Sequence, residues 1–165
     1  GDTSGGADEY LRTINGWLKK AANEVELQKD FDASNVEEIF DALIGATPKK
    51  FIRDRSQWRL YVPWHIEDLY RDTVRGRQTG GQRLYYKGFL VEAVPNMPDD
   101  RALFSTPNNQ VYGLYRDIRI EPERHAKKRQ TDFVLTLRAD CHYEDENAAT
   151  AAVLEDPDVI GSSKL

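Results

Sequence analysis

The chain has 165 residues, of which 39% are hydrophobic, and a formal net charge of −5. A chain of this length can bury the core of one compact domain. Its sequence contains neither the roughly 20 consecutive apolar residues of a membrane helix nor, in Gly1 to Gly6, the basic and then apolar pattern of a secretory signal. Because Cys141 is the one cysteine, it cannot form an internal disulfide, and we expect a small buried residue there.

The charge is unevenly distributed along the sequence. Residues 1–48 carry 10 acids and 4 bases, residues 49–87 carry 4 acids and 10 bases, and residues 141–165 are again acidic. Such a basic middle segment suits nucleic acid, contact with the acidic segment of another copy, or simple solvation. The last two explanations need no further partner, and we favour them over nucleic acid.

The first half of the chain is predicted to alternate helices with one short strand. Apolar spacing of three and four predicts a helix over residues 7–28. The capping-box pattern Ser34-Asn35-Val36-Glu37 predicts the start of a second helix, which Gly45 and Pro48 end. A strand is predicted over residues 58–62 and a helix over 64–75, with Pro63 at its start. Gly76 to Gln82 is predicted to be a loop.

The second half is predicted to be mostly extended. We expect a strand over residues 84–94, interrupted at Lys87-Gly88, then a rigid segment with two prolines and a short strand over 102–105. Gln110 to Tyr143 follows as a long antiparallel ribbon with one buried apolar face and a solvated connector at 121–130. Alanines favour a helix over 144–154. Disorder is expected beyond Pro157.

Motifs for catalysis or metal binding are missing from the sequence. The glycine-rich stretch at 76–81 lacks the lysine of a phosphate-binding loop. Cys141 and His142 are neighbours on a strand and point to opposite faces, so they cannot easily share a metal ion. The acid pairs Glu67-Asp68 and Asp99-Asp100 suit a helix start and a turn better than acid–base catalysis. We therefore predict no enzyme, catalytic residue, metal site or cofactor, and rank a small hydrolase last.

Several segments, taken in order, resemble one known family. The segments are Tyr86-Lys87-Gly88-Phe89-Leu90-Val91, then Val94 to Pro98, Asn108 to Gly113, Arg116 to Ile120, and the run Thr131 to Arg138. Their order and spacing are similar to the C-terminal half of tailed-phage major capsid proteins. The resemblance covers about residues 10–145, and Ile14 to Leu18 and the Val36 to Leu43 helix take part in it less specifically.

This resemblance implies an α+β capsid-type fold, in which helices flank the sheet of an axial domain and a long antiparallel ribbon leaves it. It implies four segments: a disordered or tag-derived stretch at 1–9, an axial-type domain at 10–120, the continuing ribbon of a peripheral domain at 121–145, and a short helix with a disordered tail at 146–165. The family's N-terminal arm, extended loop and spine helix have no counterpart here, so we expect a C-terminal fragment.

The function implied is that of a structural phage or prophage protein, which self-assembles into the icosahedral shell enclosing viral DNA. Its expected partners are other copies and a scaffold protein, with packaged DNA contacted indirectly and no membrane. It would lie in the virion after assembly in the bacterial cytoplasm. The candidate interface residues are Trp64, Arg71, Arg75, Arg77, Arg83, Phe133, Leu135 and Leu137.

The alternative function is that of a non-enzymatic, nucleic-acid-associated phage accessory protein. It would use the basic residues near Trp58, although Trp17, Trp58 and Trp64 suit anchors in a core or an interface better than a platform for stacking bases. The basic residues are Lys49, Lys50, Arg53, Arg55 and Arg59. Such binding weakens steeply with salt, which distinguishes it from the capsid function.

Overall fold

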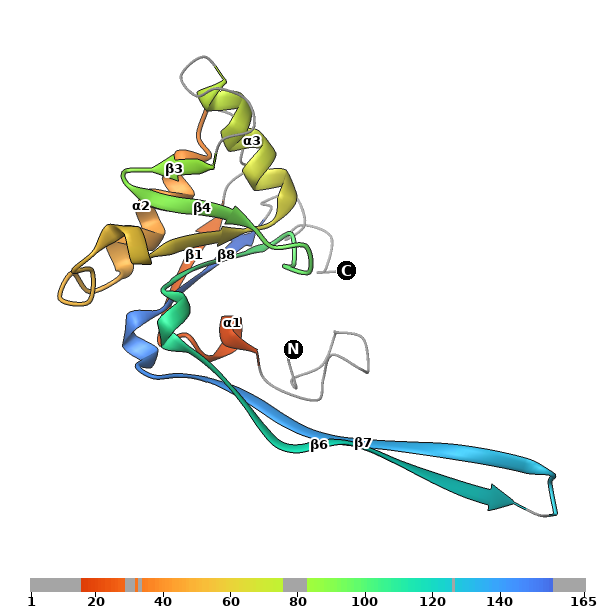
Figure 1. The fold of residues 1–165 in the computed structure, drawn as a ribbon. Helices are drawn as coiled ribbons and strands as arrows, with labels where there is room; N and C mark the ends of the chain where they lie inside the picture. The colour runs from red at the N-terminus through yellow and green to blue at the C-terminus, as the bar shows by residue number, and fades with distance from the viewer. Residues whose placement is uncertain (1–15, 29–31, 33, 76–82, 126, 156–165) are drawn as a thin grey trace, which may run out of the picture.

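The computed structural model describes residues 16–28, 32, 34–75, 83–125 and 127–155. Six strands form one mixed sheet in the order β1-β8-β5-β2-β4-β3, and the other two, β6 and β7, form a separate ribbon (Figure 1). The sheet strands are β1 Asn23–Gln28, β2 Arg59–Val62, β3 Leu84–Tyr86, β4 Phe89–Ala93, β5 Arg101–Ser105 and β8 Thr150–Glu155. The ribbon strands are β6 Gln110–His125 and β7 Gln130–Tyr143. The expected α+β class is confirmed.

The hydrophobic core lies between one face of the sheet and two helices, α2 Glu37–Ala46 and α3 Trp64–Val74. Alternate residues along each strand contribute to it, as one covered sheet face requires. Phe40 of α2 joins the layers, because its ring lies 5.0 Å from that of Tyr70 on α3 and 5.2 Å from that of Tyr86 on β3. Both helices therefore pack on the same face of the sheet.

The predicted N-terminal helix is wrong over its second half. Residues 7–15 lie outside the described part. α1 is one turn, Trp17–Lys20, and Asn23–Gln28 then form the strand β1, parallel to β8. Val25 and Leu27 alternate with the exposed Glu24 and Glu26, which is the period of a strand.

The start of α2 also differs from the prediction. Ser34 does not cap the helix. Instead the Asp32 carboxylate accepts hydrogen bonds from the Ser34 amide and hydroxyl, at 2.8 and 2.6 Å, and the helix begins at Glu37. The far end is as predicted within two residues, since the helix ends at Ala46 before Pro48.

The prediction for residues 84–94 was wrong in topology. Lys87 and Gly88 both have positive φ, 49° and 89°, so they form a two-residue turn that reverses the chain. β3 and β4 are consequently an antiparallel hairpin. The strand at 58–62, the helix at 64–75 and the strand at 102–105 are confirmed with end shifts of one residue. The loop predicted at 76–82 lies outside the described residues.

The helix predicted over residues 144–154 is wrong. Its place is taken by a single 3-10 turn, Glu146–Ala148, and by β8, which lies between β1 and β5 inside the sheet. Ala149, Ala151 and Ala152 are all buried there, because small side chains fit a sheet interior crossed by a helix. Tertiary pairing thus overrides the helix propensity of alanine. The predicted tail beyond Pro157 lies outside the described part.

Two glycines are expected to respond in opposite directions to replacement by alanine. Gly88→Ala will destabilise the protein by about 1 kcal/mol, because an L side chain resists positive φ. Gly45→Ala will stabilise it by about 0.5–1 kcal/mol, because Gly45 is helical, in the last turn of α2, and an added Cβ meets nothing within 4 Å. Urea unfolding of both variants measures the difference, and shifts of the same sign would contradict it.

Candidate subunit interface

The ribbon leaves the compact body and extends away from it (Figure 1). Its strands pair from Gln110 with Tyr143 at the base to His125 with Gln130 at the tip. The predicted connector is thus shorter than expected, because β6 continues through Pro122 to His125. Pro122 is tolerated since a two-stranded ribbon has two edges, and its missing amide need not face the partner strand.

Two irregularities in β6 keep the ribbon's faces in phase. The register shifts once between Leu114 and Arg116 and again between Arg116 and Arg119. Each shift adds one residue to β6 relative to β7, so the two offsets together restore the alternation. As a result Leu114 lies opposite Ala139 and Ile120 lies opposite Leu135. One apolar face therefore continues along the ribbon across both bulges.

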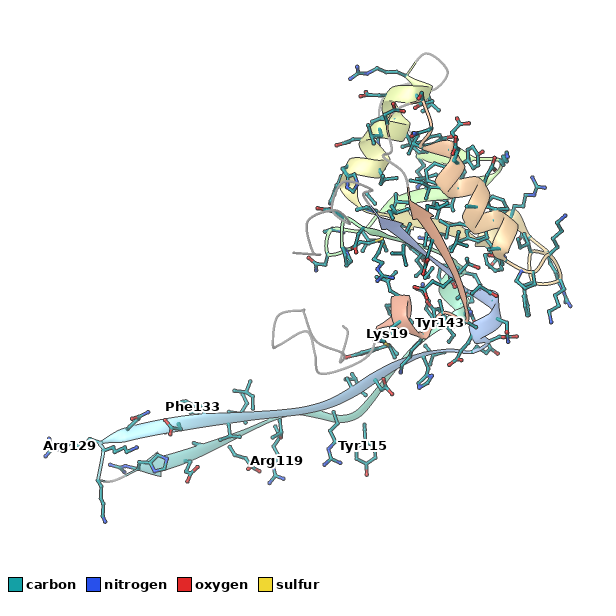
Figure 2. The ribbon with its side chains drawn as sticks, turned by 180° about the vertical axis from the view of Figure 1, so that it is seen from behind. Lys19, Tyr115, Arg119, Arg129, Phe133 and Tyr143 are labelled. Atoms are coloured by element: carbon teal, nitrogen blue, oxygen red, sulfur yellow. The ribbon has the colours of Figure 1, made fainter. Side chains whose placement is uncertain are left out.

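The apolar face of the ribbon is exposed, in contrast to the burial predicted for it. We define the apolar face as Tyr112, Leu114, Ile120, Pro122, Phe133 and Leu135. Phe133 is 65% exposed and Leu135 63% exposed. Figure 2 shows Phe133 on one side of the ribbon and Tyr115 and Arg119 on the other. A contiguous exposed apolar surface of this kind marks a binding surface.

The base of the ribbon is anchored to the compact body, and here the predicted burial is confirmed for Cys141, which is 5% exposed. The Lys20 ammonium donates to the Cys141 carbonyl at 2.6 Å and to the Asp140 carboxylate at 2.9 Å. The hydrogen bond from Lys20, with that from the Cys141 amide, lowers the pKa of the Asp140 carboxyl. The buried Tyr143 hydroxyl donates to the Trp17 carbonyl at 2.8 Å. α1 therefore holds the point where the ribbon starts.

The ribbon base predicts a loss of stability in alkali. Burial raises the pKa of the Tyr143 hydroxyl well above its usual value, and the nearby Cys141 and Tyr61 add to the effect. Above about pH 10 the unfolded chain loses this proton while the folded chain keeps it, so stability present below pH 10 falls as the pH rises.

The substitution Tyr143→Phe tests whether the Tyr143 hydroxyl causes this loss of stability in alkali. The variant loses the hydrogen bond to Trp17, which costs about 0.5–1.5 kcal/mol at neutral pH. Its unfolding free energy will then fall less steeply than that of the wild type between about pH 9 and pH 11. Urea unfolding at several pH values measures both slopes, and equal slopes would contradict the assignment.

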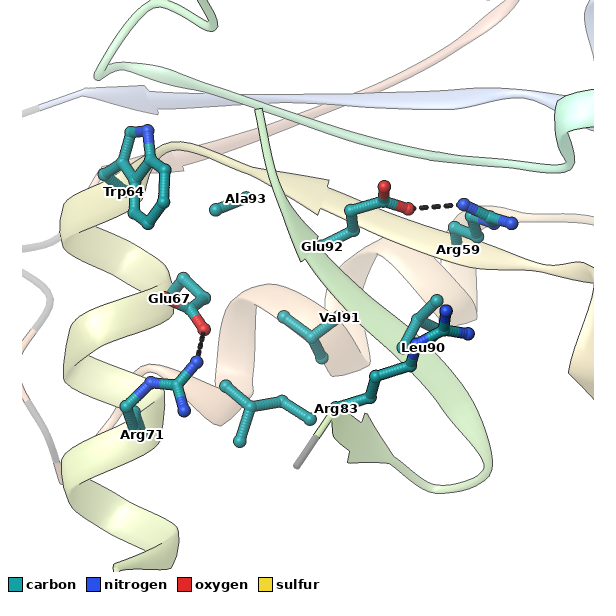
Figure 3. Close-up of a pocket in the computed structure, with 10 residues that line it drawn as sticks. Arg59, Trp64, Glu67, Arg71, Arg83, Leu90, Val91, Glu92 and Ala93 are labelled. Atoms are coloured by element: carbon teal, nitrogen blue, oxygen red, sulfur yellow. Dashed lines mark hydrogen bonds and ion pairs between the residues drawn. The ribbon is translucent and has the colours of Figure 1, made fainter. Parts of the chain in front are cut away.

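A groove with a volume of about 380 Å³ lies between α3 and β4 on the compact body (Figure 3). Arg59 pairs with Glu92 at 2.6 Å, and Arg71 pairs with the buried Glu67 one turn before it in α3. Arg83 has no ion-pair partner among the described residues. With Trp64 56% exposed beside it, the groove offers one free cation and one large apolar side chain.

The structure thus separates the predicted interface residues into two places. Trp64, Arg71 and Arg83 line the groove, and Arg75 lies at the end of α3, 3.4 Å from Asp72. Phe133 and Leu135 lie on the ribbon. Arg77 falls outside the described residues, as does the side chain of Leu137. Sequence reasoning did not select Ile120, although its place in the β6 alternation was an available signal.

Trp58 is a core residue, as expected for an anchor, and therefore offers no platform for stacking bases. Trp58 is 3% exposed and its ring lies 4.7 Å from that of Phe104 in the core. The guanidinium of Arg55 lies over the Phe89 ring and donates to the Lys87 carbonyl.

Within the described residues, no group of three or more histidines, cysteines and acids is placed to hold a metal ion. Of the helices in that part, none has the length and apolar character of a membrane span.

Comparison with proteins of known sequence finds one informative relative. The chain is 28% identical to "Putative prophage capsid protein YqbE" of Bacillus subtilis strain 168, over 93% of this chain and 54% of that protein. The chain therefore spans about half the length of this relative. No family model matches.

The fold is similar to subunits of several solved shells. A chain of the procapsid of satellite phage P4 matches with a TM-score of 0.62 and 17% identity, over 88% of this chain and 53% of that one. A chain of the capsid of an empty GTA particle gives 0.62 and 18%, over 88% and 57%. The SrpI encapsulin of Synechococcus elongatus gives 0.52 and 8%, over 89% and 56%.

The sequence relative and the structural neighbours agree with the order of segments noted in the sequence. The chain is similar in sequence to a putative prophage capsid protein, and its fold is similar to that of phage capsid subunits.

Proposed function

We propose that this protein is a structural subunit of a phage or prophage capsid, which self-assembles into the icosahedral head shell around viral DNA. The observation that carries the proposal is the apolar face of the projecting ribbon, with Phe133 65% and Leu135 63% exposed. A protein that worked alone would gain nothing from holding these side chains in water. A shell subunit buries them against its neighbours, which drives association.

The same proposal assigns a domain of the capsid subunit to each part of the structure. The compact sheet with α2 and α3 acts as the axial domain, and the ribbon belongs to the peripheral domain. The strand β8 returns to the sheet after the ribbon, so both ends of the ribbon are fixed in one body. Such a ribbon can transmit the position of one subunit to the next. Assembly takes place in the bacterial cytoplasm, with a scaffold protein as a further partner, and catalysis is not part of this function.

A second contact is proposed at the groove beside α3. Trp64 and the arginines Arg71, Arg75, Arg77 and Arg83 would meet an acidic surface of a neighbouring copy. An exposed tryptophan beside arginines has the composition of an interface hot spot. Reversing the charges of Arg75 and Arg77 together would weaken assembly of the protein in its full natural length. Unchanged assembly would remove this contact from the proposal.

The test of the function is direct. The protein in its full natural length, expressed alone or with its scaffold, is expected to form rings, tubes or shells in negative-stain images. Sedimentation separates these particles from free subunits and gives the assembled fraction. If folded protein stays monomeric in both cases, the capsid function is wrong. The salt dependence of binding to single-stranded and double-stranded DNA distinguishes the accessory-protein alternative.

A further inference from the structure

The tip of the ribbon is strongly basic. The turn between β6 and β7 joins His125 to Gln130, which still pair across the ribbon. Arg124, Lys127, Lys128 and Arg129 lie at this turn and are all exposed. Figure 2 shows Arg129 at the far end of the ribbon, away from the compact body. Four cations therefore stand together at the most distant point of the described chain.

The acids near the tip do not neutralise these cations. Asp132 faces His125 at 3.1 Å and accepts a hydrogen bond from Gln130 at 2.7 Å. Glu121 pairs with Arg119 at 2.8 Å, and Glu123 lies 4.0 Å from His125. Within the described residues no ion pair involves the four bases of the turn. Their charge remains available to a partner.

The opposite charge is concentrated in another part of the same chain. The described residues between 21 and 48, which include the strand β1 and the helix α2, contain six acids and no base. The acids are Glu24, Glu26, Asp32, Glu37, Glu38 and Asp41. Glu24 and Asp41 pair with Arg101 and Lys87. Glu26 and Glu38 are exposed, and Glu26 has no ion-pair partner in the described part.

From this charge complementarity we propose that the basic ribbon tip of one copy binds the described acids of β1 and α2 on a second copy. The inference rests on the proposed function, because it names a contact within the assembled shell. A contact between two different surfaces is heterologous and continues from copy to copy, as a ring or shell requires. Opposite charges also steer the tip to its place during association and fix its register.

Complementary charge reversal tests the contact in the protein in its full natural length. The tip variant carries Lys127→Glu and Lys128→Glu, and the body variant carries Glu26→Lys and Glu38→Lys. All four side chains are exposed, so both variants are expected to fold. The four bases of the tip fall to a net charge of zero in the tip variant, and the six acids fall to −2 in the body variant. Each variant alone therefore loses attraction at the contact and places like charges at the exchanged positions, and the concentration for half-maximal assembly will rise about tenfold or more.

The decisive measurement is the equimolar mixture of the two variants. In the mixture the new glutamates on the tip of one variant meet the new lysines on the body of the other variant, and the unchanged tip meets the unchanged acids. Opposite charges are thus restored at the exchanged positions, so the mixture will assemble at a clearly lower concentration than either variant alone. Lys49→Glu with Lys50→Glu is the control, since it makes the same charge change away from the tip. The control is expected to assemble normally.

Other results would overturn the inference. If the tip variant assembles normally but its shells retain less nucleic acid, the tip binds nucleic acid. If both variants fail and the mixture also fails, the two surfaces are not partners. If both assemble as the wild type does, the contact does not exist. None of these results affects the proposed function, which fails only if the wild-type protein does not assemble.

Discussion

Leu135→Glu is expected to prevent assembly while leaving the fold intact. Leu135 lies on the apolar face of the ribbon and is 63% exposed, so replacing it changes the free energy of unfolding by less than about 0.5 kcal/mol. Burying an apolar side chain of this size contributes about 1.5–3 kcal/mol. Its loss, together with the cost of a buried carboxylate, raises the concentration needed for assembly at least about tenfold per contact.

The neighbouring Thr136 provides the control. It lies opposite Arg119 on the other face of the ribbon and is also exposed. Thr136→Glu adds the same charge one residue away and is expected to assemble normally. Light scattering and negative-stain images measure assembly, and urea unfolding measures stability. Equal assembly of the two variants would show that the apolar face is not the contact surface.

Phe40→Ala is expected to give the largest loss of stability, about 3–5 kcal/mol. The Phe40 side chain is fully buried, and its ring packs edge-on against Tyr70. It also packs against Tyr86, so its removal leaves a cavity where α2, α3 and the sheet meet. Because the whole domain is stabilised by about 5–15 kcal/mol, the variant will be marginally stable.

Tyr85→Ala is the matched control for this prediction. Tyr85 precedes Tyr86 in β3 and is 47% exposed on the opposite face of the sheet. Its carbonyl accepts a hydrogen bond from the Tyr70 hydroxyl at 2.9 Å, and this backbone group survives the substitution. We expect a loss below about 1 kcal/mol. Chemical unfolding of both variants measures the difference, and a Phe40 variant as stable as the control would contradict this account of the core.

The sequence patterns located the elements with local signals and missed those that depend on distant pairing. Trp58 to Val62 and Trp64 to Arg75 have clear periods and a proline between them, and both are confirmed. β8 has no such signal, because its residues 150–155 form a strand only between β1 and β5. The helix propensity of alanine is a local property and contains no information about the parallel pairing with β1 or the antiparallel pairing with β5.

Two errors had signals that were present in the sequence. Glu24 and Glu26 alternate with Val25 and Leu27, which is a strand period, but the longer helical spacing upstream dominated the interpretation. The Lys87-Gly88 pair is a two-residue turn between apolar runs, which predicts a hairpin. In both places a short signal of period two or of turn chemistry was outweighed by a longer pattern.

The sequence predicted which residues share the apolar face of the ribbon, but it did not predict that this face is exposed to solvent. Alternation correctly placed Phe133 and Leu135 on one face of the ribbon, but alternation alone does not say whether that face meets the chain's own core. The uneven charge along the chain likewise singled out the basic segment that contains Arg71 without revealing that Glu67 neutralises this arginine. The sequence predicts a solvated connector at the basic tip, because charged residues are common in exposed turns.

The paired bulges of β6 limit how this protein can change in length. Each offset is one extra residue of β6 that has no opposite residue on β7. Deleting one such residue would remove its offset and leave Ile120 opposite Leu135, because the pairs on either side would then follow each other directly. One or two deletions between Leu114 and Arg119 are therefore absorbed by the bulges, whereas a third would slip the register by one residue and turn the apolar side chains to the other face.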